Sequence, residues 1–261
     1  MGSSELQGQF WGAKARDWAE LFEPMGAPLW EAMLDSTAVG RGTRLLDLGC
    51  GGGGASVLAA GRGAHVAGLD AAQALIDIAR ERVPKGDFRV GDLEELPHKD
   101  NSYDVAFASL SIMFATNPAV TLREMARVTV SGGYVTVGIW GQPEDCEYRH
   151  ILSAVAETRP SPPPGKGPFA LSGNGKLEEM IEFAGLEVVD SGEVDAPFRF
   201  SDSEMLWYLV SSAGPVQAAK QVVSEQALKA AIIRAAEPFQ TNKGDILLNN
   251  RFRYVTATTQ E

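Results

Sequence analysis

The residues best suited to chemistry in this chain are three aspartates, Asp47, Asp70 and Asp92, and the glycine-rich turn 49–54. Glycine lets the backbone adopt positive φ and approach a ligand closely, and a helix that follows offers unpaired N–H groups to that ligand. The spacing Gly49-x-Gly51-x-x-Gly54 also fits a dinucleotide fingerprint, which is a weak pattern by itself. One acid at the end of each of three consecutive predicted strands is more specific. Together these residues indicate a site for a nucleotide-type cofactor.

The elements that would position these residues alternate between strand and helix. Expected strands cover residues 44–48, 64–69, 87–90, 103–109 and 134–140, and expected helices cover 55–62, 71–83 and the segment opened by Asn117-Pro118. We expect Ser131-Gly132-Gly133 to turn the last of these helices into the fifth strand. Because strand and helix alternate at this rhythm five times, the chain is predicted to form a doubly wound parallel sheet.

The pattern is looser after residue 140. The proline-rich run 159–165 is expected to be a stiff surface connection. A helix should end at Gly185, and a sixth strand should begin at 186–189. Residues 201–240 are expected to be helical in two or three pieces, which is too long for a simple crossover and predicts a cover that lines a pocket or meets another subunit.

The N-terminal segment carries apolar residues at a helical spacing. They are Phe10, Trp11, Ala15, Trp18, Leu21 and Phe22. This spacing predicts an amphipathic helix that Pro24 and Gly26 break. Its aromatic residues either dock the helix on the core or form a lid over the cofactor, and the sequence leaves both open.

The composition favours one globular domain, residues 1–261, with 44% hydrophobic residues. A net charge of −11 argues against nucleic acid as a partner. We expect neither a signal peptide nor a membrane span, and therefore a cytoplasmic protein. Cys50 and Cys146 give no disulfide framework and no metal-ligand spacing, so both are expected to be free thiols and no metal is expected.

Three signatures support a family resemblance: Leu46 to Gly51, Gly68-Leu69-Asp70 and Gly91 to Pro97. With them the sequence resembles the class I S-adenosylmethionine-dependent methyltransferases, in particular the small-molecule branch of the methyltransferase type 11 or UbiE-like kind, over residues 40–140. The resemblance implies a Rossmann-like α/β fold with a doubly wound, mainly parallel seven-stranded sheet, and S-adenosylmethionine as cofactor with S-adenosylhomocysteine as product. It also implies an N-terminal helical lid (1–35), a cofactor-binding core (40–140), a helical cap insertion (201–240) and a final antiparallel edge strand at 251–258.

The resemblance also implies roles for particular residues. Asp70 should accept both ribose hydroxyls, Asp92 and the backbone of Leu93 should contact adenine, and Trp18 should lie against the methionine part of the cofactor. The remaining expected cofactor contacts are Asp47, Gly49, Cys50, Gly51, Ala71 and Ser109. Plainer alternatives are a loop brace for Asp47, a helix N-cap for Asp70 and a strand-end residue for Ser109. His150 is the candidate general base, whereas His65 and His98 are interpreted as surface or structural histidines.

The sequence thus predicts an enzyme that methylates an oxygen, nitrogen or carbon atom of a small, partly apolar metabolite, mainly by proximity and orientation. A dehydrogenase is disfavoured because it has no need of an adenine-binding acid at Asp92. Methylation of protein or RNA is disfavoured by the acidic charge and by the lack of an Asn/Asp-Pro-Pro-aromatic signature. The alternative is a protein that binds the cofactor without methylating, such as a cyclase of natural-product biosynthesis. A small-molecule acceptor is the expected partner, and a homodimer is left open.

Overall fold

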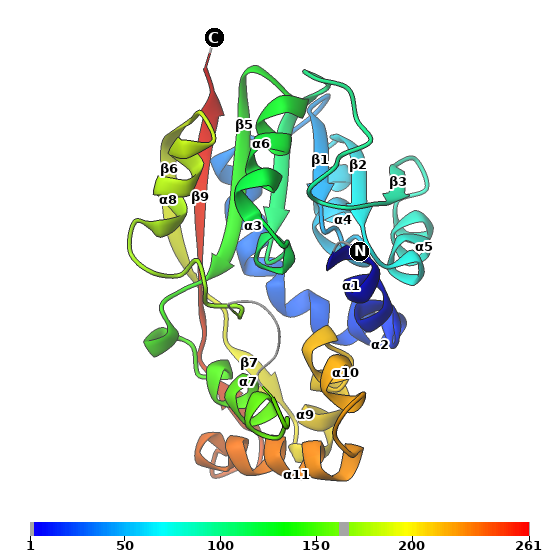
Figure 1. Ribbon diagram of the computed structural model, residues 1–261, viewed down its shortest axis with the longest axis vertical. Coiled ribbons are helices and arrows are strands. Elements are labelled where there is room, and N and C mark those ends of the chain that lie inside the picture. Colours follow the sequence, from blue (N-terminus) through cyan, green and yellow to red (C-terminus); the bar gives the residue numbers. More distant parts are fainter. Residues whose placement is uncertain (1–2, 162–166, 261) are drawn as a thin grey trace.

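The computed structural model describes residues 3–161 and 167–260, and within them the main sheet has seven strands. They are β1 (Arg44–Leu48), β2 (His65–Asp70), β3 (Asp87–Val90), β4 (Tyr103–Ser109), β5 (Thr129–Trp140), β6 (Leu186–Asp195) and β9 (Arg251–Thr259). Their order is β3-β2-β1-β4-β5-β9-β6, and β9 alone runs antiparallel to its neighbours (Figure 1). The predicted doubly wound, mainly parallel sheet is confirmed.

Helices cover both faces of this sheet. One face packs against α3 (Ala27–Ser36), α4 (Gly54–Gly61) and α5 (Gln73–Arg82), and the other packs against α6 (Pro118–Val128) and α8 (Lys176–Phe183). Two hydrophobic clusters result, one on each side of the sheet. The central strands β1, β2 and β4 are buried along most of their length, because helices cover both of their faces. The Asn117 side chain accepts a hydrogen bond from the Ala119 N–H and caps α6, as its sequence predicts.

A second layer of structure lies beyond the carboxyl ends of the parallel strands, at the bottom of Figure 1. It consists of α7 (Tyr148–Glu157), the ribbon of β7 (Phe198–Phe200) and β8 (Ile246–Leu248), and the helices α9 (Ser203–Val210), α10 (Gly214–Lys220) and α11 (Glu225–Ala236). Residues 201–240 are therefore helical in several pieces, as expected. The ribbon was not foreseen, because a strand of three residues is too short to show a period.

The N-terminal segment differs from the single helix that its spacing predicts. It is divided into α1 (Ser3–Gly12), α2 (Ala15–Asp17), the π-helical turn η1 (Trp18–Phe22) and the 3-10 turn η2 (Glu23–Gly26), which leads directly into α3. Pro24 does not end the helical path, because it lies in the first turn of η2, where a missing N–H breaks no helical bond.

The N-terminal helices pack on the helical layer rather than standing alone. A Cβ atom on Gly214 at the start of α10 would lie 2.6 Å from the Trp11 ring of α1, so the two helices are in contact. The Tyr208 hydroxyl donates a hydrogen bond of 3.0 Å to Asp17 Oδ1, and Lys14 Nζ donates one of 3.1 Å to Ser211 Oγ. The first helices and residues 203–220 thus form one continuous cover.

Two further expectations are corrected. Ser131 to Gly133 do not turn a helix into a strand, because they lie inside β5, where Gly132 has a φ of +72°. The final strand is not an edge strand. It occupies the space between β5 and β6 and pairs with both, which satisfies both sides of its backbone, and β6 forms the edge instead. Residues 162–166 of the predicted proline-rich connection lie outside the described residues.

No helix in the described part of the chain is both long enough and apolar enough to cross a membrane.

The burial of individual side chains predicts where the core is most sensitive to substitution. Phe107 in the centre of β4 is fully buried, so Phe107→Ala should lower the free energy of unfolding by about 3–5 kcal/mol. Phe183 at the end of α8 is 79% exposed, and Phe183→Ala should change it by less than about 0.5 kcal/mol. Urea unfolding followed by circular dichroism measures both. Equal losses for the two variants would contradict the assignment of β4 to the core.

Candidate functional site

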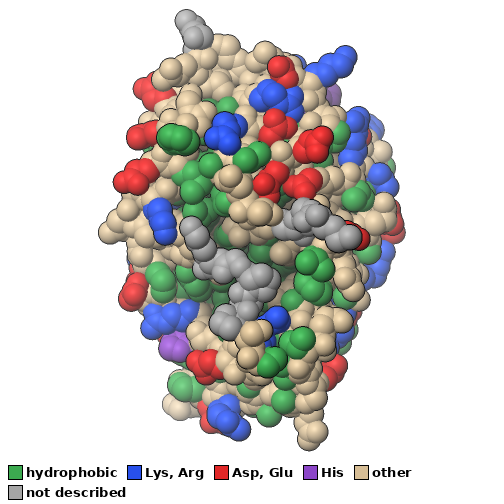
Figure 2. Space-filling model, in the orientation of Figure 1, with side chains coloured by type: hydrophobic (Ala, Val, Ile, Leu, Met, Phe, Trp, Pro, Cys, Tyr) green, Lys and Arg blue, Asp and Glu red, His purple; other side chains and the backbone are tan. Residues whose placement is uncertain are grey.

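One large cavity lies between the carboxyl ends of the strands and the helical layer. The empty space inside it, including open solvent at its mouth, is about 1480 Å³. Figure 2 shows hydrophobic side chains gathered around the hollow on this side of the molecule. Its lining includes every residue that the sequence predicts as a cofactor contact: Trp18, Asp47, Gly49, Cys50, Gly51, Asp70, Ala71, Asp92, Leu93 and Ser109.

The glycine-rich loop between β1 and α4 forms one wall of this cavity. Gly49 and Gly51 have φ values of +70° and +55°, which side chains rarely allow. A Cβ atom on Gly49 would lie 2.3 Å from Ser111 Cβ, and one on Gly51 would lie 2.7 Å from the Trp18 ring. Only glycine therefore fits, and the loop backbone lies open to the cavity.

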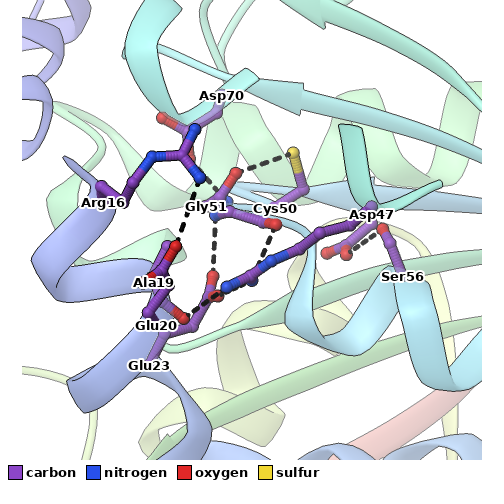
Figure 3. A network of polar contacts seen from close by, with 11 residues as sticks. Arg16, Ala19, Glu20, Glu23, Asp47, Cys50, Gly51, Ser56 and Asp70 are labelled. Carbon is purple, nitrogen blue, oxygen red and sulfur yellow. Dashed lines mark hydrogen bonds and ion pairs between the residues drawn. The ribbon is translucent and has the colours of Figure 1, made fainter. Parts of the chain in front are cut away.

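Asp47 and Asp70 hold this loop from the side of the sheet. Asp47 accepts a hydrogen bond of 2.7 Å from Ser56 Oγ of α4, and Asp70 accepts one of 2.9 Å from the Gly51 N–H (Figure 3). Asp70 also accepts one of 2.9 Å from the Ala72 N–H. Burial raises the pKa of Asp47 to about 7 and also raises that of Asp70, although backbone hydrogen bonds oppose the second shift. Asp70 therefore does more than cap a helix, and a carboxylate has further lone pairs available for a ligand.

Glu23 holds the loop from the opposite side, and sequence reasoning missed it. Its side chain points from η2 to the loop (Figure 3), where Oε1 accepts from the Gly52 N–H at 2.7 Å and Oε2 pairs with Arg82 at 2.8 Å. Arg82 also donates to the carbonyl groups of Gly52 and Ala19. Burial raises the pKa of Glu23 to about 8, and Arg82 limits the rise. The only sequence signal was an acid among apolar residues of a predicted helix.

The loop half of the cavity fits the cofactor that the family resemblance implies. Ser109 Oγ is buried at the end of β4 without a hydrogen-bond partner in the described residues, and it lines the cavity, so it is available to a polar ligand. Asp92 accepts a hydrogen bond of 2.9 Å from the Glu94 N–H, which fixes the turn that presents Leu93. Four acidic side chains line this half, from Glu23, Asp47, Asp70 and Asp92, and a ligand that carries an ammonium and a sulfonium group would favour their ionised forms.

The other half of the cavity is aromatic and comes from elements that the sequence did not assign to the site. Tyr148 of α7 stacks on Trp140 with ring centroids 5.5 Å apart and ring planes 9° apart. Phe198 of β7 and Phe22 of η1 pack against the same tyrosine at 5.5 Å and 5.9 Å. Trp30 of α3 and Phe252 of β9 complete the walls.

The histidines do not enter the cavity, so the prediction of His150 as a base is corrected. His150 is exposed on α7 and packs on Phe239, because it lies two residues, or about 200°, around the helix from the inward-facing Tyr148. His65 is exposed at the start of β2, and His98 Nδ1 lies 2.8 Å from the Tyr103 hydroxyl. The last two positions agree with surface and structural roles.

Both cysteines are buried and unbridged, and burial raises the pKa of the Cys50 thiol well above its usual value. Among residues 3–161 and 167–260, no group of three or more His, Cys, Asp or Glu side chains could hold a metal ion.

Comparison with known proteins adds three findings. The family model for a methyltransferase domain matches residues 46–137. An uncharacterized protein of Mycobacterium tuberculosis is 32% identical over 153 residues, which cover 57% of this chain and 55% of that protein. The malonyl-(acyl-carrier protein) O-methyltransferase of Serratia marcescens is 37% identical over 94 residues, which cover 36% of this chain and 37% of that enzyme.

The solved structure of the cyclase SpnF shares the fold, with a TM-score of 0.57 and 23% identity over 89% of this chain and 80% of that one. The predicted resemblance to class I S-adenosylmethionine-dependent methyltransferases is confirmed by the family match and the O-methyltransferase relative. The chain spans about half the length of the mycobacterial relative and less of the O-methyltransferase.

The buried Asp47 predicts a pH dependence of stability. Because its pKa rises from 3.8 to about 7 on folding, the folded state binds this proton more tightly than the unfolded state. The free energy of unfolding should therefore fall as the pH rises from about 4 to about 7, by up to about 1.4 kcal/mol per pH unit, and this group should cause no further change above about pH 7. Asp47→Asn keeps an acceptor for Ser56 and should gain stability relative to the wild type as the pH rises from 4 to 7.

The control is Asp104→Asn. Because Arg44 lowers the pKa of Asp104, the contribution of Asp104 to the free energy of unfolding changes only below the usual pKa range of an aspartate. Urea unfolding of the three proteins at several pH values measures the differences. A constant difference between the wild type and Asp47→Asn from pH 4 to 7 would show that Asp47 is not held protonated.

Proposed function

We propose that this chain, whose residues 46–137 form a methyltransferase domain of the S-adenosylmethionine-dependent class, transfers a methyl group to a small, partly apolar metabolite. The observation that supports this most strongly is the convergence of every predicted cofactor contact on one cavity that also has a separate aromatic half. The acceptor atom can be oxygen, nitrogen or carbon.

Within this proposal the loop half binds the cofactor. Asp70 accepts the ribose hydroxyls, and Asp92 and the Leu93 backbone contact the adenine. The glycine loop and Asp47 lie along the amino-acid part, and Trp18 covers it from η1. When bound, the cofactor supplies a methyl group that its sulfonium already activates.

The chain would then act by positioning rather than by proton transfer. In the described part of the cavity no histidine is available as a base, and burial raises the pKa of Tyr148, which keeps that phenol protonated. The aromatic half would hold the acceptor against the loop half and exclude water, which is sufficient when the leaving group is already activated. Residues 1–35 and 201–240 serve in this proposal as a lid and cap over the cavity, to which Trp11, Ala213 and Pro215 contribute.

The alternative is a protein that binds the cofactor but catalyses another reaction, such as a cyclisation in natural-product biosynthesis. The fold shared with the cyclase SpnF is compatible with it but does not favour it, because 23% identity reports the fold alone. Methylation is preferred since a curated relative that aligns with part of the core is an O-methyltransferase. Association into homodimers remains a prediction.

Calorimetry tests the cofactor. S-adenosylhomocysteine should bind in the micromolar range and NAD should not, because the four acidic side chains of the loop half suit a ligand that carries an ammonium group and disfavour the anionic pyrophosphate of NAD. Binding of NAD without binding of S-adenosylhomocysteine would show that the glycine loop serves a dehydrogenase.

A matched pair of variants tests Asp70. Asp70→Ala should weaken S-adenosylhomocysteine binding by about 1.5–3 kcal/mol, the scale of hydrogen bonds to a charged group. Asp77→Ala changes an exposed aspartate of α5 outside the cavity and should leave the affinity unchanged. Asp70→Asn keeps one acceptor and should give an intermediate loss in the same titration. If Asp70→Ala matched the wild type, Asp70 would have only the structural role of holding Gly51 and Ala72.

A further inference from the structure

The phenol of Tyr148 is an unusual group in the aromatic half of the cavity. Its side chain is almost completely buried and lines the cavity, yet its hydroxyl has no hydrogen-bond partner among the described residues. Tyr148 lines the cavity, and its hydroxyl is not one of the fully buried polar atoms that lack a partner, so the hydroxyl is reached from the cavity. The hydroxyl is therefore available to a ligand in this half.

The position of this hydroxyl is fixed before any ligand arrives. The ring lies parallel to Trp140 and is held at its sides by Phe198 and Phe22, and the Tyr148 N–H donates 2.9 Å to Asn250 Oδ1. These contacts come from four separate parts of the chain, so the ring has little freedom to turn. A preorganised donor loses little entropy on binding, which favours selective recognition of one polar atom.

The ionisable side chains among the described lining residues belong to the other half of the cavity. They are Glu23, Asp47, Asp70 and Asp92; the first three hold the glycine loop or the helix after it, and Asp92 lies after β3. A charged acceptor in the aromatic half would find no charged partner among the residues that the structure describes there, and would lose its hydration. A flat ring system, in contrast, would gain stacked or edge contacts with the surrounding rings.

We propose that the aromatic half binds a neutral, planar ring system that carries one polar oxygen or nitrogen atom, and that the Tyr148 hydroxyl donates a hydrogen bond to this atom. This inference rests on the proposed function, since it identifies the acceptor class of the same site. Tyr148 positions the acceptor and fixes which of its atoms is presented to the loop half. Leu152 and Pro168 border the same space and limit the size of the ring system.

Binding of small probes to the full chain with saturating S-adenosylhomocysteine tests the proposal. The probes are 2-naphthol, naphthalene, 2-naphthoate and the non-planar decahydro-2-naphthol, and equilibrium dialysis measures each affinity. We expect 2-naphthol to bind about tenfold more tightly than naphthalene, the size of one net hydrogen bond. The carboxylate and the non-planar alcohol should both bind more weakly than 2-naphthol. Tightest binding of 2-naphthoate, or no binding of 2-naphthol, would overturn the proposed acceptor class.

Two variants test whether the preference for 2-naphthol over naphthalene comes from Tyr148. Tyr148→Phe should reduce the tenfold ratio between 2-naphthol and naphthalene to about one while leaving the naphthalene affinity unchanged. Tyr134→Phe makes the same chemical change on a partly exposed strand residue outside the cavity and should keep the ratio. A ratio that stays near ten in Tyr148→Phe, or an equal loss for both probes, would show that the hydroxyl does not anchor the ligand.

A third variant separates this proposal from the proposed function. Leu152→Trp should fill the aromatic half and abolish probe binding, while S-adenosylhomocysteine still binds in the loop half. If the wild type binds S-adenosylhomocysteine but Leu152→Trp still binds 2-naphthol normally, the acceptor assignment fails and the cofactor assignment stands. If the wild type fails to bind S-adenosylhomocysteine, the proposed function itself fails.

Discussion

The structure depends on how the glycine loop between β1 and α4 is held open toward a ligand. Its backbone cannot be covered by side chains of its own, so carboxylates from other elements satisfy its N–H groups: Asp70 at Gly51 and Glu23 at Gly52. Glu23 is buried and needs Arg82 beside it, which fixes η2 on the end of α5. The loop geometry thereby places the N-terminal helices as well as the sheet. Substitution of either Asp70 or Glu23 would therefore disturb both the N-terminal helices and the loop at the end of the sheet.

Much of the fold could be predicted from the sequence because parallel strands buried on both faces give plain apolar runs. The ranges 44–48 and 103–109 agree with β1 and β4, which are mostly buried. Prediction failed where tertiary contacts override local pattern. The glycines at 132 and 133 suggest a turn but lie in β5. The position of β9 between β5 and β6 depends on strand pairing between distant segments, which no local sequence pattern encodes.

The two halves of the cavity also differed in how well the sequence predicted their residues. Asp47 lies near the end of β1, Asp70 ends β2 and Asp92 comes two residues after β3, so the sheet brings them together and their spacing reveals them. Tyr148, Phe198 and Phe252 come from α7, β7 and β9 and meet only after the chain folds back over the sheet. No sequence signal marked Tyr148. The sequence favoured its neighbour His150 as a base, but the turn of α7 directs His150 away from the cavity. Predicting the cofactor half was therefore feasible, and predicting the acceptor half was not.

The central claim is that one cavity holds an adenosyl cofactor in its loop half and a planar ligand in its aromatic half. A crystal structure of the chain with S-adenosylhomocysteine and 6-bromo-2-naphthol tests this directly, because the anomalous signal of bromine locates the ring. The account predicts adenosine between Asp70 and Asp92, and bromine among Trp140, Phe198 and Phe252 with the naphthol oxygen next to Tyr148. Bromine in the loop half, or adenosine outside the glycine loop, would contradict it.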